Sequence, residues 1–433
     1  MSALRHRITW PLLGGLAIVL VTTAAHDAPP YPLDGYEHTG IRRLRAYRMM
    51  IEGTMPGGYR LPPGAKLPAA AIRLRLAEVD ETLDIGPNTP VDSQLQRGID
   101  RIVATRDPSY RLAVLDITDP TKPRYAATRP REGYTPGSIG KLLVATAVFH
   151  QLKKRYPDDV AARARVLRDT RIVADRWVIP NSHAVPVVAD DWSGVTHRGV
   201  RVGDEFSLWE WIDHALSPSS NAAGTMAWKH AMLMEAFGAR YPVSVQEQEA
   251  FFRETPKREL ATLAYRVIEE PLLEMGLDTA QLKLRTFFTN TAAGIVPGQA
   301  SLVTPEQLVR WMVKLEQGKV VDRWSSLEIK KLMYFTRRRY RYAASPRLDS
   351  AAVFFKSGSL FRCKPEPDYQ CVQYKGNLQN LMHSVAIIES PAGGERPRVY
   401  LVAMMSDVLK LNSAQVHQDI AGRVEQLIRS LDP

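Results

Sequence analysis

The stretch Thr135-Pro136-Gly137-Ser138-Ile139-Gly140-Lys141 leads directly into an apolar run that continues to Leu152. Its first two residues are typical of a helix start, a capping residue followed by proline at the first helical position. Apolar residues occupy nearly every face of the helix that follows, so we expect this helix to be buried. Ser138 and Lys141 are three residues apart and share one helical face, so the hydroxyl and the amine lie close enough to exchange a proton.

Segments with strand character lie on both sides of this buried helix in the sequence. Leu112–Thr118 is followed by the turn Asp119-Pro120, and Arg124–Thr128 is expected to return as its hairpin partner. Strands at both ends of the domain with helices between them predict an α+β fold whose sheet is completed by the two chain ends. The later strands are expected at Ala352–Lys356, Ser384–Glu389 and Val399–Met405. The clearest helices are expected at Phe206–Ala215, Pro305–Gln317 and Ser326–Met333, and over the amphipathic segment of Val416, Ile420, Val424, Leu427 and Leu431.

The composition is that of a globular protein with excess positive charge. The 433 residues include 57 Lys+Arg and 46 Asp+Glu, for a net charge of +11, with 45% hydrophobic and 24% charged residues. These values argue against a disordered, collagen-like or multi-span membrane chain. The positive charge favours anionic surfaces such as a bacterial envelope. No basic patch interleaved with aromatic residues indicates nucleic acid, and the cluster Arg337, Arg338, Arg339 and Arg341 is expected to be a solvated loop.

The first 30 residues are typical of an export signal. Arg5-His6-Arg7 precedes the apolar run Trp10–Val21, which is followed by the small residues Thr22-Thr23-Ala24-Ala25. A basic start, a short apolar core and small residues at the end make up a secretory signal peptide. We therefore expect residues 1–25 to be a signal peptide and the protein to be periplasmic or extracellular. The alternative is a retained N-terminal membrane tether, because the apolar run is near the lower length for spanning a bilayer.

Residues 26–104 contain many prolines and glycines, such as Pro56-Gly57-Gly58 and Pro62-Pro63-Gly64. They carry no catalytic pattern, although the short segment Ile41–Met50 is compatible with a helix. We expect this region to be an N-terminal extension that packs on, or tethers, the main domain at residues 105–430.

The two cysteines, Cys363 and Cys371, lie eight positions apart in a proline-containing loop. Two cysteines exclude a disulfide-dense scaffold and a four-cysteine zinc site. In an oxidising compartment we expect them to form a disulfide that contributes roughly 2–3 kcal/mol. The alternative is a pair of unpaired, buried thiols.

Two more short motifs follow the serine–lysine pair along the chain. Ser219-Ser220-Asn221 follows the helix expected to end near Leu216, and Lys356-Ser357-Gly358-Ser359 closes the strand Ala352–Lys356. A small residue and a glycine at that strand end let a substrate backbone come near. Each motif alone is weak evidence, but their order and their placement on a helix start, a loop and a strand make the set specific.

This set resembles the motifs of the penicillin-recognising serine hydrolases, the class A β-lactamases and penicillin-binding D,D-peptidases. The resemblance covers roughly residues 105–430 and includes the loop Ala215–Asn221 and the helix start Leu302-Val303-Thr304-Pro305. It implies a five-stranded antiparallel sheet with flanking helices plus an all-helical lobe. It also implies an acyl-enzyme formed with a β-lactam or a D-Ala-D-Ala-like amide. We expect a monomer without cofactor or metal ion.

Carried over onto this sequence, the resemblance makes Ser138 the acylated nucleophile and Lys141 its proton acceptor. Ser219 would relay a proton to the leaving nitrogen, and Lys356 would bring positive charge near Ser219 and the substrate carboxylate. A free lysine has a pKa of about 10.4, so a neutral Lys141 near pH 7 costs roughly 4–5 kcal/mol. Burial and the nearby Lys356 would both lower that pKa. The alternative is an exposed Lys141 in the first helical turn with Ser138 as a capping residue, although a lysine there opposes the helix dipole.

The remaining motif residues would bind the substrate. Asn221 would hold the amide side chain of the substrate, and Ser357 would bind its carboxylate next to Gly358. The backbone N–H groups of Ser138 and Ser359 would form the oxyanion hole, where each donor is typically worth roughly 3 kcal/mol in the transition state.

One stretch departs from the class A pattern. Class A β-lactamases carry a glutamate in the omega loop that activates the water for deacylation, but the corresponding stretch Arg285–Asn290 has no carboxylate. Thr286 stands at the glutamate position, and Asn290 is retained. The nearest upstream carboxylates are expected on a solvated helix face: Glu269, Glu270 and Glu274. We therefore expect slow turnover of β-lactams, which favours a D,D-peptidase or another amide or ester hydrolase over an efficient β-lactamase. The alternative is a β-lactam or muropeptide sensor, or a cell-wall binding module.

The long insert between the first two motifs is expected to reshape the cleft. It contains Trp177, Trp192, His183 and His197. The two histidines do not form a metal-ligand cluster in the sequence, so we expect them to have ordinary structural roles.

Overall fold

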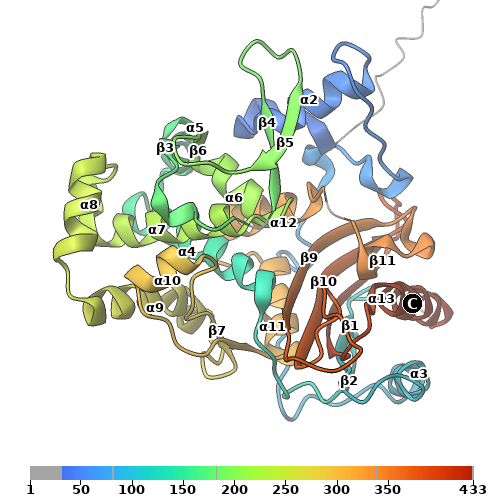
Figure 1. Ribbon diagram of the computed structural model, residues 1–433. Helices are drawn as coiled ribbons and strands as arrows, with labels where there is room; N and C mark the ends of the chain where they lie inside the picture. Colours follow the sequence, from blue (N-terminus) through green and yellow to red (C-terminus); the bar gives the residue numbers. More distant parts are fainter. Residues whose placement is uncertain (1–31, 80–81, 182, 338, 432–433) are drawn as a thin grey trace, which may run out of the picture.

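A computed structural model describes residues 32–79, 82–181, 183–337 and 339–431 (Figure 1). The expected signal peptide, residues 1–25, lies outside the described residues. Within the described ranges, no helix is both long enough and apolar enough to cross a membrane.

The main sheet is antiparallel and five-stranded, in the order β2-β1-β11-β10-β9. Strand β1, from the start of the domain, lies between β2 and β11, so the two ends of the domain complete the sheet as the sequence predicts. The strands of this sheet are β1 Arg111–Asp116, β2 Arg124–Thr128, β9 Ala352–Arg362, β10 Gln379–Ser390 and β11 Arg398–Asp407. Smaller two-stranded pairs are formed by β3 Arg171–Val173 with β6 Glu205–Ser207, β4 Ala184–Val188 with β5 Val195–Gly199, and β7 Leu282–Lys283 with β8 Leu302–Val303.

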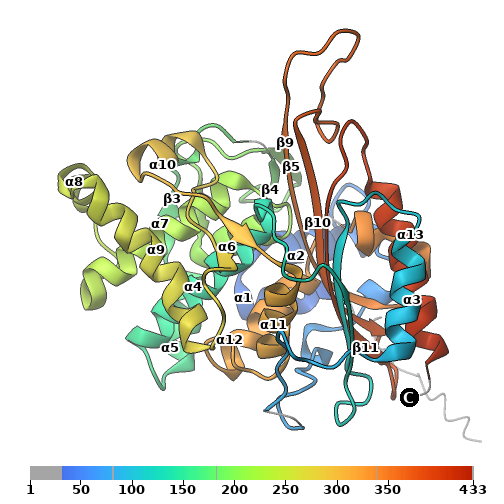
Figure 2. The ribbon, with the colours of Figure 1, turned by 90° about the horizontal axis from the view of Figure 1, so that it is seen from below.

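Helices cover both faces of the main sheet, which confirms the α+β β-lactamase/transpeptidase-like architecture (Figures 1 and 2). Helices α3 and α13 pack side by side on one face, and α11 and α12 contact the other face. Helix α4 lies between α12 and the helical lobe, where it contacts α6, α7 and α9. The helices are α1 Tyr36–Thr39, α2 Arg42–Ile51, α3 Ser93–Val103, α4 Gly140–Arg155, α5 Val160–Asp169, α6 Leu208–Leu216, α7 Asn221–Phe237, α8 Val245–Glu254, α9 Lys257–Glu274, α10 Asn290–Ile295, α11 Pro305–Glu316, α12 Arg323–Tyr334 and α13 Ala414–Ser430.

Side chains along β9 alternate between the two faces of the sheet, as a strand requires. Phe354 joins the core shared with the helical lobe, whereas Val353 and Phe355 pack into the core beneath α13. Lys356 is two residues after Phe354 and therefore faces the helical lobe.

Two predicted element boundaries are wrong. Strand β9 continues to Arg362 instead of ending at Lys356, because β10 pairs with it as far as Gln379 opposite Arg362. The buried helix does not start with a Thr135 cap: a 3-10 turn, Gly137–Ile139, precedes α4, and no side chain caps either element. The other expected helices and strands are present with ends shifted by a few residues, and the Cys363–Cys371 disulfide is confirmed, with its Cα atoms 6.0 Å apart.

The N-terminal extension, called the N-terminal segment from here on, contacts both the helical lobe and the main sheet. Its helix α2 confirms the one expected at Ile41–Met50, and Arg43 on α2 forms a buried ion pair with Asp213 on α6, with a nitrogen–oxygen distance of 2.6 Å. Burial alone would lower the pKa of Arg43, but the Asp213 carboxylate raises it above its usual value. Further along, the Gly64 N–H donates to the Asp349 carbonyl at 2.7 Å, next to the start of β9.

We expect Arg43→Met to lower the free energy of unfolding by about 3–5 kcal/mol, because it leaves the Asp213 carboxylate buried without its partner. The matched control is Arg48→Met on the same helix, since Arg48 pairs with Glu52 at 2.7 Å on the exposed side. The control should change the free energy by less than about 1 kcal/mol. Urea unfolding of both variants measures the difference, and similar small losses in the two would contradict a structural role for the buried pair.

Candidate active site

The serine and the lysine of the first motif are in hydrogen-bond contact. Ser138 lies in the 3-10 turn before α4, and Lys141 lies in the first turn of α4 itself. The Nζ atom of Lys141 is 2.9 Å from the Oγ atom of Ser138. The Lys141 side chain is fully buried, and Ser138 is half-buried. The alternative of an exposed first-turn lysine is therefore wrong.

The second motif meets the same amine. The Nζ atom of Lys141 lies 2.6 Å from the carbonyl oxygen of Ser219 and 2.7 Å from the Oδ1 atom of Asn221. Asn221 is the first residue of α7, whose N-cap is Ser220: the Ser220 side chain accepts from the Ala223 N–H at 3.2 Å. The capped helix start thus fixes the position of Asn221 beside Lys141.

Ser219 connects the second motif to the third. Its backbone φ is 67°, in the left-handed region that a serine adopts only at an energetic cost of order 1 kcal/mol. Its carbonyl oxygen faces Lys141, while its Oγ atom accepts from the Nζ atom of Lys356 at 2.8 Å. The strained backbone therefore presents two oxygens of one residue to two buried amines.

Two glycines allow strand β9 to approach the turn of Ser138. A Cβ atom on Gly358 would lie 2.3 Å from the carbonyl oxygen of Pro136, and one on Gly137 would lie 2.8 Å from the backbone nitrogen of Ser359. Gly137 also has a φ of 53°, which disfavours any larger residue. The backbone next to Ser138 therefore lies against the backbone of Ser359. Ser138 and Ser359 are the two residues expected to form an oxyanion hole.

A cavity of about 380 Å³ opens onto Ser138. Asn221 and Ser359 from the other two motifs also line it. None of the described residues that line this cavity carries a carboxylate.

The stretch predicted to replace the omega-loop glutamate forms part of the wall. Thr286 lines the cavity and donates from its hydroxyl to the Gln299 carbonyl at 2.6 Å. Phe288 also lines the cavity, and its ring centre is 5.0 Å from the Nζ atom of Lys141. Asn290, by contrast, is exposed at the start of α10 and does not line the cavity.

The sequence analysis missed two residues beneath β9. The Tyr340 hydroxyl is 2.6 Å from the Oγ atom of Ser357, and the Nη1 atom of Arg341 donates to the Gly358 carbonyl at 2.6 Å. Arg341 is only 1% exposed, so the expectation that this basic cluster is a solvated loop is wrong. Backbone carbonyls of the sheet and the ring of Tyr340 surround its guanidinium. A run of arginines in the sequence does not indicate which of the side chains will be buried and which will be exposed.

The insert between the first two motifs contributes one cavity residue, His183. The Nε2 atom of His197 instead lies 3.0 Å from the Tyr47 hydroxyl, in contact with the N-terminal segment. Trp177 packs against Phe287, and Trp192 packs against the N-terminal segment.

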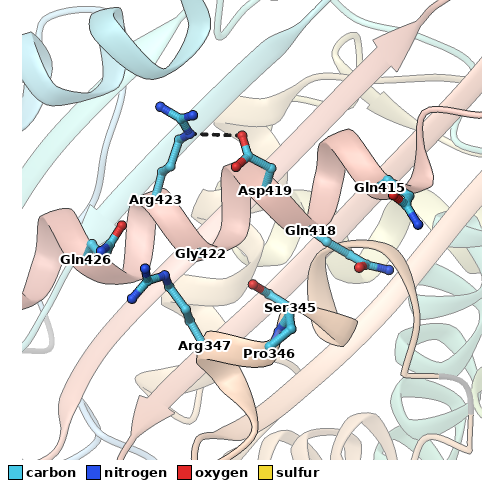
Figure 3. Close-up of a pocket in the computed structure, with 9 residues that line it drawn as sticks. All are labelled: Ser345, Pro346, Arg347, Gln415, Gln418, Asp419, Gly422, Arg423 and Gln426. Carbon is cyan, nitrogen blue, oxygen red and sulfur yellow. Dashed lines mark hydrogen bonds and ion pairs between the residues drawn. The ribbon is translucent and has the colours of Figure 1, made fainter.

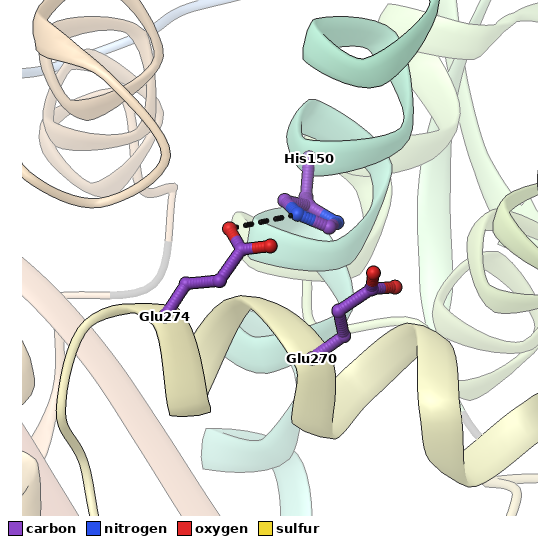
Figure 4. A group of neighbouring side chains, drawn as sticks. All are labelled: His150, Glu270 and Glu274. Carbon is purple, nitrogen blue, oxygen red and sulfur yellow. Dashed lines mark hydrogen bonds and ion pairs between the residues drawn. The ribbon is translucent and has the colours of Figure 1, made fainter.

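Within the part of the chain that the structure describes, one group of side chains has the spacing of metal ligands, namely His150, Glu270 and Glu274 (Figure 4). Both carboxylates already have partners: Glu274 lies 3.0 Å from the Nε2 atom of His150, and Glu270 lies 3.2 Å from the Nζ atom of Lys154. Glu269 likewise pairs with Arg285 at 2.8 Å. Glu270 and Glu274 on α9 thus contact α4, Glu269 contacts Arg285 beyond these two helices, and none of the three carboxylates lines the cavity at Ser138.

A larger surface hollow, of about 840 Å³, lies along α13 (Figure 3). It is lined by glutamines and by Arg347 and Arg423, and the latter pairs with Asp419 at 2.9 Å. None of the three motifs contributes to it.

The fold matches that of known structures. A structure of PBP-A described as an acyl-enzyme complex with penicillin G aligns over 80% of this chain and 100% of its own, at 13% identity and a TM-score of 0.50. TLA-3, described as an extended-spectrum β-lactamase, aligns over 77% of this chain and 96% of its own, at 14% identity and a TM-score of 0.52. No protein-family model and no curated relative matches the sequence. The chain therefore has the fold of the serine β-lactamases and penicillin-binding proteins.

Acid should destabilise the protein through His383, which lies on β10 opposite Gly358. Burial lowers the pKa of His383 to about 4, and its Nε2 atom is 3.1 Å from the Thr135 carbonyl. Because the unfolded chain binds this proton below about pH 6.5 and the folded chain does not, stability falls as the pH drops from 6.5 towards 4. Between pH 7 and about 4.5 the loss from this residue should be about 2–3 kcal/mol.

The test compares urea unfolding of the parent protein and of His383→Gln at both pH values. Glutamine does not titrate, and its amide can still donate to the Thr135 carbonyl. The variant should lose less stability on acidification than the parent. Equal losses would show that His383 does not contribute to the acid sensitivity.

Proposed function

We propose that residues 105–430 form an active-site serine hydrolase domain that makes an acyl-enzyme at Ser138 with a β-lactam or a D-Ala-D-Ala-like amide. The observation that carries this proposal is the buried Lys141 amine, 2.9 Å from the Ser138 hydroxyl oxygen. A structural lysine gains little from burial beside a half-exposed serine, whereas a proton acceptor needs both burial and that contact.

Acylation begins with the transfer of the Ser138 hydroxyl proton to the neutral amine of Lys141. Burial favours this neutral form, and so does the second amine, Lys356, which contacts the same residue, Ser219. The freed Ser138 oxygen attacks the substrate carbonyl carbon and forms the new C–O bond. Negative charge then develops on the carbonyl oxygen, where the backbone N–H groups of Ser138 and Ser359 stabilise it.

The leaving nitrogen takes its proton from the hydroxyl of Ser219. As the C–N bond breaks, that proton is replaced from the Nζ atom of Lys356, 2.8 Å away. The products of this step are an ester at Ser138 and a released or ring-opened amine. Ser219 thus contacts both lysines, Lys141 through its carbonyl oxygen and Lys356 through its hydroxyl, which explains why its strained backbone is tolerated.

Substrate binding is assigned to the edge of β9 and the start of α7. Ser357 and Lys356 bind the substrate carboxylate, and Asn221 holds the amide side chain. Tyr340 supports this arrangement, because its hydroxyl contacts the Ser357 hydroxyl at 2.6 Å and fixes where that hydroxyl points.

Deacylation is expected to be slow. No described residue that lines the cavity offers a carboxylate to activate water, and Thr286 occupies that part of the wall. This observation favours a D,D-peptidase over an efficient β-lactamase. It also supports a second candidate function, a β-lactam or muropeptide sensor in which the long-lived ester is itself the signal.

We further propose that the protein is exported and acts as a monomer on peptidoglycan-like peptides. The Cys363–Cys371 disulfide supports an oxidising compartment. The net charge of +11 suits the anionic bacterial envelope.

Incubation with a fluorescent penicillin followed by intact-mass measurement tests the proposal. We expect one covalent adduct in the parent protein and none in Ser138→Ala, because the ester forms on that oxygen. Ser93→Ala, an exposed serine at the start of α3, should label like the parent. Labelling that persists in Ser138→Ala, or its absence from the parent, would contradict the assignment.

Thr286→Glu should shorten the lifetime of the adduct by about ten-fold or more, because a carboxylate on this wall can act as a general base for water. Thr286→Gln is the matched control, since it has the same size without the base. The measurement is the loss of the adduct mass with time after the free penicillin is removed. Equal lifetimes in the two variants would mean that position 286 does not face the deacylating water.

A further inference from the structure

Among the described residues, one strongly basic side chain lines the cavity at Ser138, that of Arg362, and it takes no part in the proposed chemistry. Arg362 is the last residue of β9 and is exposed. Among the described residues, no carboxylate pairs with its guanidinium and none lines the cavity. The cavity therefore has a positive charge at one end that is not neutralised by the part of the protein described here.

The protein holds the backbone of Arg362 in place. Arg362 pairs with Gln379 on β10, and its carbonyl accepts from the Leu378 N–H at 3.1 Å. The next residue, Cys363, is tied by the disulfide to Cys371 in the loop that projects beyond the sheet (Figure 2). That loop has two acidic residues: Glu366, which is bound by Lys410 and by Asn377 at 2.9 Å, and the exposed Asp368. Neither carboxylate is paired with the Arg362 guanidinium.

Because of the direction of β9, Arg362 lies near the part of the substrate that stays bound to Ser138 as the acyl group. Lys356, Leu360 and Arg362 project to the same face because they are separated by even numbers of residues. Lys356 lies where the substrate carboxylate is proposed to bind. From there β9 passes Ser359, and Arg362 follows three residues later, about 10 Å further along the strand at 3.3 Å per residue.

Apolar and polar side chains both line the cavity that contains Ser138 and Arg362. The large apolar side chains among them are Leu284, Phe287, Phe288 and Leu360. These apolar side chains can contact the apolar part of an acyl group, and an anionic substituent on that group can meet the Arg362 guanidinium.

We infer that Arg362 selects substrates whose acyl group carries an anionic substituent. This inference rests on the proposed acylation of Ser138 and narrows the substrate class of that site. The leaving side of the substrate is recognised by Lys356 and Ser357, so a preferred substrate carries negative charge on both sides of the reacting bond.

The test uses three penicillins that share one scaffold and differ at the side-chain α-carbon. Carbenicillin carries a carboxylate there, benzylpenicillin is neutral, and ampicillin carries an ammonium group. The second-order rate constant for acylation of each is measured by intact mass at low salt. We expect carbenicillin to react at least about five-fold faster than ampicillin, the size expected for an exposed ion pair.

Two substitutions and one control identify the residue responsible. Arg362→Gln should reduce the carbenicillin-to-ampicillin ratio towards one, and Arg362→Glu should invert it. Lys364→Gln removes an exposed charge two residues away that does not line the cavity, and should leave the ratio unchanged. Added salt should lower the ratio in the parent protein and not in Arg362→Gln.

The outcomes separate this inference from the proposed function. If all three penicillins acylate Ser138 with a ratio that Arg362 substitutions do not alter, the inference is wrong and the proposed function stands. If none of them acylates Ser138, the proposed function fails, and the inference fails with it.

Discussion

The buried amine of Lys141 is the constraint on which the site depends. It lies within hydrogen-bond distance of Ser138, Ser219 and Asn221, residues from two distant stretches of the chain. An amine that is fully shielded from water loses its solvation unless such oxygens replace it. The same three contacts therefore stabilise the lysine and assemble the first two motifs. Strand β9 joins them through Lys356 and the Ser219 hydroxyl.

The surrounding packing keeps this amine in place. Helix α4 is buried on nearly every face, and the glycines Gly137 and Gly358 let its leading turn contact β9 without space for a side chain. On the other side, Arg43 from the N-terminal segment neutralises Asp213 on α6. The Asp213 carbonyl accepts from the Ser217 N–H at 2.7 Å, where α6 ends and the loop that leads to Ser219 begins. The N-terminal segment thus supports the helical lobe close to the site.

Hydrophobic periodicity predicted the main helices and strands, because it is a short-range pattern. The meeting of the three motifs was implied by their resemblance to those of the penicillin-recognising serine hydrolases. The sequence did not predict the full length of β9, since the pairing of Arg362 with Gln379 joins residues 17 positions apart on two strands. Nor did it predict the burial of Arg341, which depends on carbonyls and rings brought together only by the fold. Tyr340 had no sequence signal at all, since its role comes from contact with Ser357 across 17 residues.

The most direct measurement is a crystal structure of the protein after reaction with benzylpenicillin. The account predicts continuous density from the Ser138 Oγ atom to an opened β-lactam. The ester carbonyl oxygen should lie within hydrogen-bond distance of the backbone nitrogens of Ser138 and Ser359, and the penicillin carboxylate should lie beside Ser357. An adduct on another residue, or an ester at Ser138 whose carbonyl oxygen points away from Ser359, would contradict it.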